Sequence, residues 1–296
     1  MIQISFQLLV SFQISRGTAM VMAADFKIAK PVEFYQQFLG EYVRPDGRGL
    51  EEFKKTLLNI DSISTAEGSA LVKLGNTTVL CGIKAEIAQP SLDAPNGGFI
   101  VSSVELPPLC SAKFRPGPPS EQAQVLTQFL IDTANSSSFL KPESLCIAQG
   151  KAVWCLYADV ICLNYDGNIQ DAALFALLAA MHNCSLPSAS YSEETGETVV
   201  STDKKSSLDI ASNPIASTFA VFQNSQVVAD PTEEEEGIAD TVITIVTLED
   251  NSLCSVYKPG GLAIKDDIFR QCIDRALSRG QELRQTIEKL TANIDR

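Results

Sequence analysis

The hydrophobic and polar positions of this chain alternate in some stretches and recur every three to four residues in others. The strongest block covers residues 152–181. Its first part, residues 152–163, is a near-continuous apolar run that predicts a buried strand. Turn-forming residues follow at Asp166-Gly167-Asn168. Residues 172–181 are apolar on every face, which predicts a helix inside a large core, with Asp171 capping or preceding it.

Both halves of the chain carry predicted strands followed by predicted helices. We expect strands at residues 56–60, 69–73, 77–85, 99–106, 215–222, 226–229, 241–247 and 253–257, and helices at 33–42, 120–135 and 266–294. The pattern predicts an α+β protein with two domains, residues 31–190 and 208–290. A polar stretch at residues 185–207 is interpreted as a surface excursion at the domain boundary.

The composition excludes several classes of protein. The chain has 296 residues, of which 45% are hydrophobic, enough for a substantial core. Its net charge of −13 argues against a free-standing nucleic-acid binder, because phosphate attraction needs clustered cations, although partners could supply them around an RNA channel. The same charge is typical of a soluble protein kept dispersed by repulsion. Eight cysteines without a CxxC pair, with His182 as the only histidine, argue for reduced core cysteines and against disulfide frameworks, metal cages and histidine-dependent triads.

The first thirty residues differ from the rest. Residues 4–14 are apolar but interrupted by polar side chains, and no basic segment precedes them. The run is too short and polar to span a bilayer, and no other candidate span exists. We expect residues 1–30 to be a disordered or artefactual extension, with Met20 or Met22 as alternative starts, in a cytosolic or nuclear protein.

Several sequence blocks, in this order and spacing, resemble RNase PH-like proteins. They are Arg44-Pro45-Asp46-Gly47-Arg48, residues 68–77, Tyr165-Asp166-Gly167-Asn168 and Asp230-Pro231-Thr232 with its acidic run. The resemblance covers about residues 34–284. Within the family, residues 107–110, 117–119 and 145–147 are most similar to a subunit of the eukaryotic RNA exosome. The resemblance implies the RNase PH fold, a βαβ-containing two-domain arrangement with mixed sheets packed by helices.

The resemblance also implies an ancestral chemistry that can be checked residue by residue. Active relatives shorten RNA from its 3′ end by phosphorolysis, which requires cations or N–H donors on the phosphate and carboxylates for a metal or a proton. Their phosphate-binding turn ends in Thr-Arg, where this chain has Ile169 and Gln170. A neutral amide binds phosphate more weakly than a guanidinium does. The helix at residues 120–135 has no basic residue where relatives carry arginines, and Asp132 would repel phosphate.

The family's pair of catalytic aspartates, six positions apart, has two alignments here. One places the pair on Glu234 and Asp240, and the other places it on Glu236 and Val242, which loses a carboxylate. By composition alone, residues 233–236 are interpreted as a solvated acidic loop. In either alignment we expect no catalytic residues, no metal and no cofactor, because nothing brings the phosphate in.

Basic side chains that could contact RNA are few. Lys113 and Arg115 lie in a Pro-rich loop between a predicted strand and helix. They are either surface charges or, as the resemblance implies, residues facing RNA. Arg44 and Arg48 could contact RNA or tie down their own turn, and the second interpretation is favoured. Asp159 is interpreted as a satisfied or edge-facing residue of its strand.

The resemblance therefore implies a non-catalytic ring subunit of the RNA exosome, supporting 3′-to-5′ processing of ribosomal RNA and decay of messenger RNA. Its implied partners are other RNase PH-like subunits, as a heterodimer within a six-membered ring, cap subunits with RNA-binding domains, and RNA passing through the complex. No membrane partner is expected, and the implied location is the nucleus, nucleolus and cytoplasm. Two alternatives stay open: a phosphorolytic 3′–5′ exoribonuclease whose site is shared with a partner, and an acidic adaptor without RNA contact.

Overall fold

The computed structural model describes residues 26–193, 196–222 and 226–294, without the side chains of residues 202–205 and 290–294. Most of the predicted extension at residues 1–30 therefore lies outside the described residues. The chain divides into two units, residues 1–52 and 53–296. The first unit contains α3 (Pro31–Gly40) and the turn at Gly47, where Arg48 Nε donates to Asp46 Oδ2 at 2.7 Å. The predicted role of Arg48 in tying down this turn is confirmed.

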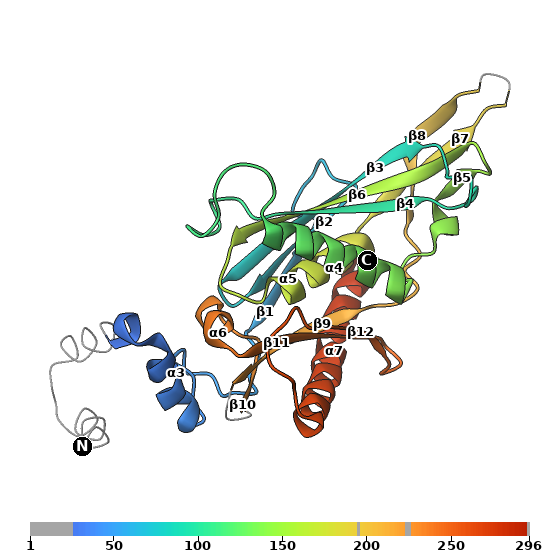
Figure 1. Cartoon of the computed structure of the whole chain (residues 1–296). Coiled ribbons are helices and arrows are strands. Elements are labelled where there is room, and N and C mark those ends of the chain that lie inside the picture. The colour runs from blue at the N-terminus through green and yellow to red at the C-terminus, as the bar shows by residue number, and fades with distance from the viewer. Residues whose placement is uncertain (1–25, 194–195, 223–225, 295–296) are drawn as a thin grey trace, which may run out of the picture. The chain divides into compact units, whose positions relative to one another are not determined.

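The second unit is built around a mixed six-stranded sheet (Figure 1). Its order is β1-β2-β3-β6-β4, with the short strand β5 (Cys146–Ala148) also paired to β6. β4 runs parallel to β6, whereas the other pairs are antiparallel. The long strands are β1 (Thr56–Ile60), β2 (Gly68–Leu74), β3 (Thr77–Ala88), β4 (Phe99–Glu105) and β6 (Ala152–Asn164). They confirm the strands predicted for this half.

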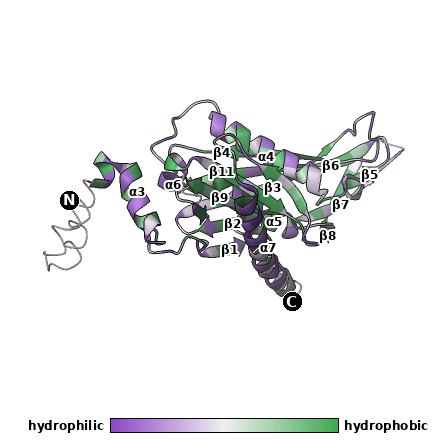
Figure 2. Cartoon of the chain, turned by 60° about the horizontal axis from the view of Figure 1, so that its bottom comes forward, coloured by the Kyte–Doolittle hydropathy of each residue, from purple (hydrophilic) through white to green (hydrophobic). Residues whose placement is uncertain are grey.

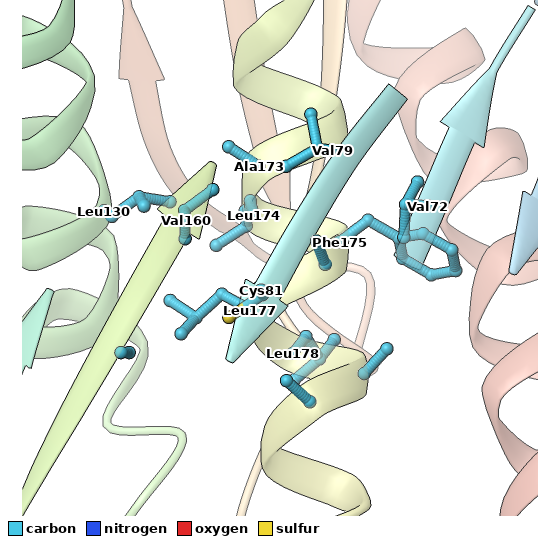
Figure 3. Packing of buried hydrophobic residues seen from close by; sticks show 14 of the residues in the cluster. Val72, Val79, Cys81, Leu130, Val160, Ala173, Leu174, Phe175, Leu177 and Leu178 are labelled. Atoms are coloured by element: carbon cyan, nitrogen blue, oxygen red, sulfur yellow. The ribbon is translucent and has the colours of Figure 1, made fainter. Parts of the chain in front are cut away.

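Helix α5 (Ile169–His182) fills the centre of the core. Its residues from Ala172 to Met181 are all buried, as their uninterrupted apolar sequence predicts. Figure 3 shows its Leu174, Phe175 and Leu177 among side chains of β2, β3 and β6. Helix α4 (Glu121–Ser137) packs against β4, and Ser120 caps it by accepting the Ala123 N–H at 3.2 Å. A 3-10 helix, η1 (Pro142–Leu145), follows.

A second, antiparallel sheet has the order β10-β9-β11-β12. Its strands are β9 (Ile215–Phe222), β10 (Gln226–Ala229), β11 (Thr241–Thr247) and β12 (Leu253–Tyr257). All four were predicted. Helix α7 (Asp266–Ile294) packs an apolar stripe against β9 and β11, and Figure 2 shows hydrophilic colouring along much of its length. The predicted helix at residues 266–294 is confirmed.

The polar stretch at residues 185–207 is not merely a loop. It forms an antiparallel pair, β7 (Ser185–Tyr191) and β8 (Thr198–Ser207), which extends beyond the main sheet in Figure 1. The predicted surface excursion is thus an ordered hairpin. Its strands were not predicted, because few apolar residues mark them, although Leu186 of β7 is buried. The boundaries at residues 190 and 208 stay a prediction.

The cysteines behave as their sequence context indicated. All eight are free, and six are buried. The buried ones are Cys81, Cys110, Cys155, Cys162, Cys184 and Cys272. No helix among the described residues combines the length and the apolar character needed to cross a lipid bilayer.

Candidate functional site

The site lies in the turn that leads from β6 into α5. Thr77 at the start of β3 holds this turn, because its hydroxyl accepts the Asp166 N–H at 3.1 Å and donates to the Gly167 carbonyl at 2.7 Å. Asn168, directly before α5, has a left-handed conformation with φ of 49°. The backbone of Thr232 and Glu233 lies so close to Gly167 that a Cβ there would stand 2.5 Å from the Glu233 nitrogen. The turn and the acidic segment are therefore one packed site.

The acidic run at residues 233–236 is the start of a helix, α6 (Glu233–Ile238). The prediction of a solvated loop was wrong, because Thr232 and Glu235 form a capping box that starts the helix. The Thr232 N–H donates to Glu235 Oε2 at 2.8 Å, which places Glu235 in the interior with 1% exposure. Acidic side chains in the first helical turn are also favoured by the helix dipole.

A network of buried polar groups holds the turn in place by hydrogen bonds. The Asn168 side-chain amide donates to Asp171 Oδ2 at 2.8 Å and to Asp230 Oδ1 at 2.6 Å. Asp171 also accepts the backbone N–H and the hydroxyl of Thr218 at 3.0 and 2.7 Å. Burial and then the nearby Asp230 raise the pKa of Asp171 to about 6. Asp171 thus joins α5 to β9 from within the first helical turn and does not cap the helix.

Lys54 supplies the cation of this network. Its Nζ donates to the carbonyls of Asp166 and Pro231 at 2.8 and 3.1 Å and lies 3.7 Å from Asp230 Oδ1. Its backbone N–H donates to Asp230 Oδ2 at 2.8 Å. Sequence reasoning missed Lys54. The available signal was that two acidic blocks, at Asp166 and Asp230, had no cation assigned to them.

Glu236 is the acidic residue that faces the turn. Its Oε1 accepts the Asn168 backbone N–H at 2.6 Å, and its Oε2 accepts the Tyr165 hydroxyl at 3.3 Å. The same hydroxyl accepts a hydrogen bond from Gln122 of α4 at 3.0 Å. Burial raises the pKa of Glu236 to about 7, against the opposing effects of the Asn168 N–H, Lys54, Tyr165 and Lys113. The carboxylate is thus surrounded by donors and positive charge.

The other predicted site residues lie around this centre. Gln170 is half-buried at the second position of α5. Glu234 is exposed on α6. Asp240 lies between α6 and β11, where its N–H donates to the Val221 carbonyl at 3.1 Å. Val242 is the second residue of β11.

Lys113 and Arg115 are both exposed on the Pro-rich loop. Lys113 Nζ lies 5.3 Å from the centre of the Tyr165 ring and 3.9 Å from Glu233 Oε1, so it borders the turn. Arg115 lines a separate hollow of about 260 Å³ between this loop and Ser120 at the start of α4. Asp159, in β6, accepts the Ser103 hydroxyl at 2.7 Å, as expected for a satisfied residue.

Comparison with known proteins identifies the family. Residues 52–187 match the model of the 3′ exoribonuclease family, RNase PH, domain 1, and residues 212–279 match its domain 2. The chain belongs to the RNase PH family. The predicted family and fold are thereby confirmed.

This RNase PH family member has curated and structural relatives of matching length. It is 40% identical to exosome complex component rrp43 of Schizosaccharomyces pombe over 254 residues, which is 86% of the chain and 94% of that protein. It is also 40% identical to exosome complex component Rrp42 of Pyrococcus furiosus, covering 86% of the chain and 91% of that protein. A chain of the Archaeoglobus fulgidus exosome with RNA bound to the active site superposes with a TM-score of 0.78 and 31% identity, covering 90% and 99% of the two chains.

The raised pKa values predict how the stability of this RNase PH family member depends on pH. Folding raises the pKa of Glu236 to about 7 and that of Asp171 to about 6. The folded chain therefore keeps protons that the unfolded chain releases near pH 4, and this stabilisation is full below about pH 4 and lost as the pH rises through about 7. Glu236→Gln should reduce this fall in the free energy of unfolding by about 3 kcal/mol. Urea denaturation at several pH values measures this effect, and Glu234→Gln, at an exposed position, is the control. If the free energy of unfolding depends on pH equally in the wild type and both variants, the raised pKa does not belong to Glu236.

Proposed function

We propose that this chain is a non-catalytic ring subunit of an RNA exosome. The observation that carries the proposal is a complete RNase PH scaffold whose turn before α5 offers carboxylates and no arginine. Support also comes from the relatives, which are exosome components by name in both a eukaryote and an archaeon. The subunit then acts in 3′-to-5′ RNA processing and decay by completing the ring and its RNA channel, while other proteins cut the RNA.

The charges around the turn support a silent site. Phosphorolysis brings an inorganic phosphate against a phosphodiester, so cations must offset two anions. The described cations beside the turn are already engaged: Lys54 with Asp230 and two carbonyls, and Lys113 with Glu233. Gln170 brings no charge, and Ile169 is buried with 1% exposure, so neither replaces the Thr-Arg pair of active relatives. The contact of Glu236 with the turn supports the alignment on Glu236 and Val242, which keeps one carboxylate of the catalytic pair.

The partners and the RNA path follow from the same proposal. Neighbouring RNase PH-like subunits complete a six-membered ring, and cap subunits with RNA-binding domains sit on it. Lys113 and Arg115 are the exposed cations on the loop that we assign to the RNA path. The complex then occupies the nucleus, nucleolus and cytoplasm, and this chain enters with its partners because its sequence has no clear basic localisation cluster.

A phosphorolysis assay tests the silent site. The purified chain is incubated with inorganic phosphate, magnesium and an RNA with a single-stranded 3′ tail. We expect no phosphate-dependent release of nucleoside diphosphates from the chain alone or from the ring assembled with its RNase PH-like partners. Release by the chain alone would overturn the proposal.

The competing function is a phosphorolytic exoribonuclease that borrows its cations from a neighbour. It is favoured by Glu236, whose pKa of about 7 suits a proton donor at neutral pH. Phosphorolysis by the assembled ring that is lost with Glu236→Gln, and kept with Glu234→Gln, would establish this alternative. A stable monomer that joins no RNase PH-like partner would instead point to an acidic adaptor.

A further inference from the structure

Strand β4 forms one edge of the six-stranded sheet and lies beside α4 (Figure 1). Among the described residues, β4 pairs only with β6. On its other side, the N–H of Gly98, directly before β4, donates to the Pro142 carbonyl at 2.9 Å. Further along the same side, the Val104 N–H donates to Thr127 Oγ1 of α4 at 3.1 Å. The free side of β4 is therefore closed near both of its ends.

Between these ends, the backbone groups of Ile100 and Ser102 face the free side of the strand. Every second residue of a strand directs its N–H and carbonyl to the same side, and Gly98 and Val104 direct theirs away from β6. Unpaired edge groups bind other extended segments, and proteins usually protect such edges with Lys, Pro or bulges. Residues 99–105 contain neither Lys nor Pro, and their register with β6 has no bulge. The two residues thus form an open edge.

A hollow of about 210 Å³ lies along the open edge of β4. Apolar side chains line most of it, including Ile131 and Ala134 of α4 and Leu140 and Leu145 after this helix. Ser102 also lines it and is only 4% exposed, yet its hydroxyl has no hydrogen-bond partner among the described residues. A buried hydroxyl without a partner costs free energy, and a ligand that brings a polar group to it removes this cost.

The size and charge of the hollow indicate what it binds. A cavity of about 150 Å³ holds benzene, and sites for drug-sized molecules begin at about 300 Å³. A hollow of about 210 Å³ therefore fits one large apolar side chain. Residues 131–145, which supply much of its lining, carry two exposed carboxylates, Asp132 and Glu143, and one exposed lysine, Lys141. In a chain of net charge −13, this excess favours a ligand with positive charge beside the apolar group.

We propose that the open edge of β4 binds a short extended segment of a partner protein, which pairs with Ile100 and Ser102 and inserts one leucine or aromatic side chain into the hollow. Strand addition of this kind takes affinity from main-chain hydrogen bonds and specificity from the pocket. Because only two residues of the edge are open, the segment is short, and basic residues beside the inserted side chain face Asp132 and Glu143. The inference goes beyond the proposed function and does not involve the turn before α5.

Synthetic peptides test this contact in the purified full chain. The probe has one leucine between threonines at its centre, two lysines at each end and a fluorescent label whose anisotropy reports binding. It should bind at least tenfold tighter than a peptide with alanine for the leucine, and than a peptide whose central amides are methylated and cannot pair with a strand. Glutamates in place of the lysines should weaken binding at least threefold. No binding of the leucine peptide, or equal binding of any of these controls, overturns the inference and leaves the silent site untouched.

Variants of the chain locate the contact. Ala134→Phe fills the hollow from α4 and should weaken binding of the leucine peptide at least tenfold, whereas Ser136→Phe, at an exposed position outside the hollow, should leave it within twofold. Ser102→Ala removes the hydroxyl that lacks a partner and should weaken binding at least threefold. Thermal unfolding shows that each variant keeps the fold. Unchanged binding by Ala134→Phe or by Ser102→Ala overturns the inference.

Hydrogen exchange of single amides, measured by NMR, tests the pairing without a substitution. In the free chain, the amides of Ile100 and Ser102 should exchange at least tenfold faster than those of Val101 and Ser103, which face β6. Saturation with the leucine peptide should slow exchange at Ile100 and Ser102 at least tenfold. Equal exchange of all four amides in the free chain, or no slowing by the peptide, overturns the inference.

Discussion

Replacing Lys54 by Met should lower the free energy of unfolding by about 3 kcal/mol, within the range found when one partner of a buried ion pair is removed. Lys54 is 6% exposed, and its Nζ lies 3.7 Å from Asp230 Oδ1. Met fills a similar volume but leaves the Asp230 carboxylate buried without a cation. It also leaves the carbonyls of Asp166 and Pro231 without the donor that joins them. Urea denaturation monitored by tryptophan fluorescence measures the loss.

The neighbouring Lys55 is a matched control, because it has the same side chain and is exposed. Lys55→Met should change the free energy of unfolding by less than about 0.5 kcal/mol, as surface substitutions usually do. Lys54→Arg keeps the charge but not the compact ammonium geometry, so it should recover only part of the stability. Equal effects of Lys54→Met and Lys55→Met would show that the buried network does not depend on Lys54.

The contrast between Lys54 and α5 shows which features a sequence can reveal. Helix α5 and strand β6 were predicted because most of their residues are buried, and such elements have long apolar runs in their sequences. The role of Lys54 depends on contacts with residues 112 and 177 positions away, which no local pattern contains. The hairpin of β7 and β8 was missed for a related reason, since few apolar residues mark its strands in the sequence.

The acidic segment was misread for a different reason. Four consecutive glutamates have the composition of a solvated loop, but Thr232 preceding them by one residue and Glu235 at the third helical position form a capping box. The capping box could have been recognised in the sequence, but the run of negative charge favoured the interpretation as a loop. The choice between Glu234 and Glu236 had no such signal, because both are acidic. Only the position of α6 against the turn distinguishes them.

Gly167→Ala should be the most damaging of the conservative changes in the turn, lowering the free energy of unfolding by about 2 to 4 kcal/mol. Gly167 has φ of 74°, where an added Cβ costs about 1 kcal/mol in backbone strain alone. That Cβ would also stand 2.5 Å from the Glu233 nitrogen and from the Thr232 carbonyl carbon. Both are backbone atoms, so α6 itself must move away from the turn.

Gly150 separates these two contributions, because it has a similar φ of 67° and nothing within 4 Å of the place its Cβ would take. Gly150→Ala should therefore show the backbone strain alone, about 1 kcal/mol. The difference between the two variants measures how tightly α6 is packed on the turn, and urea denaturation of both gives it directly. Because moving α6 also carries Glu236 away from Asn168, Gly167→Ala should weaken hydrogen-exchange protection at the Asn168 amide, and Gly150→Ala should not. Equal losses of stability in the two variants would show that the packing of α6 on the turn contributes nothing measurable to stability.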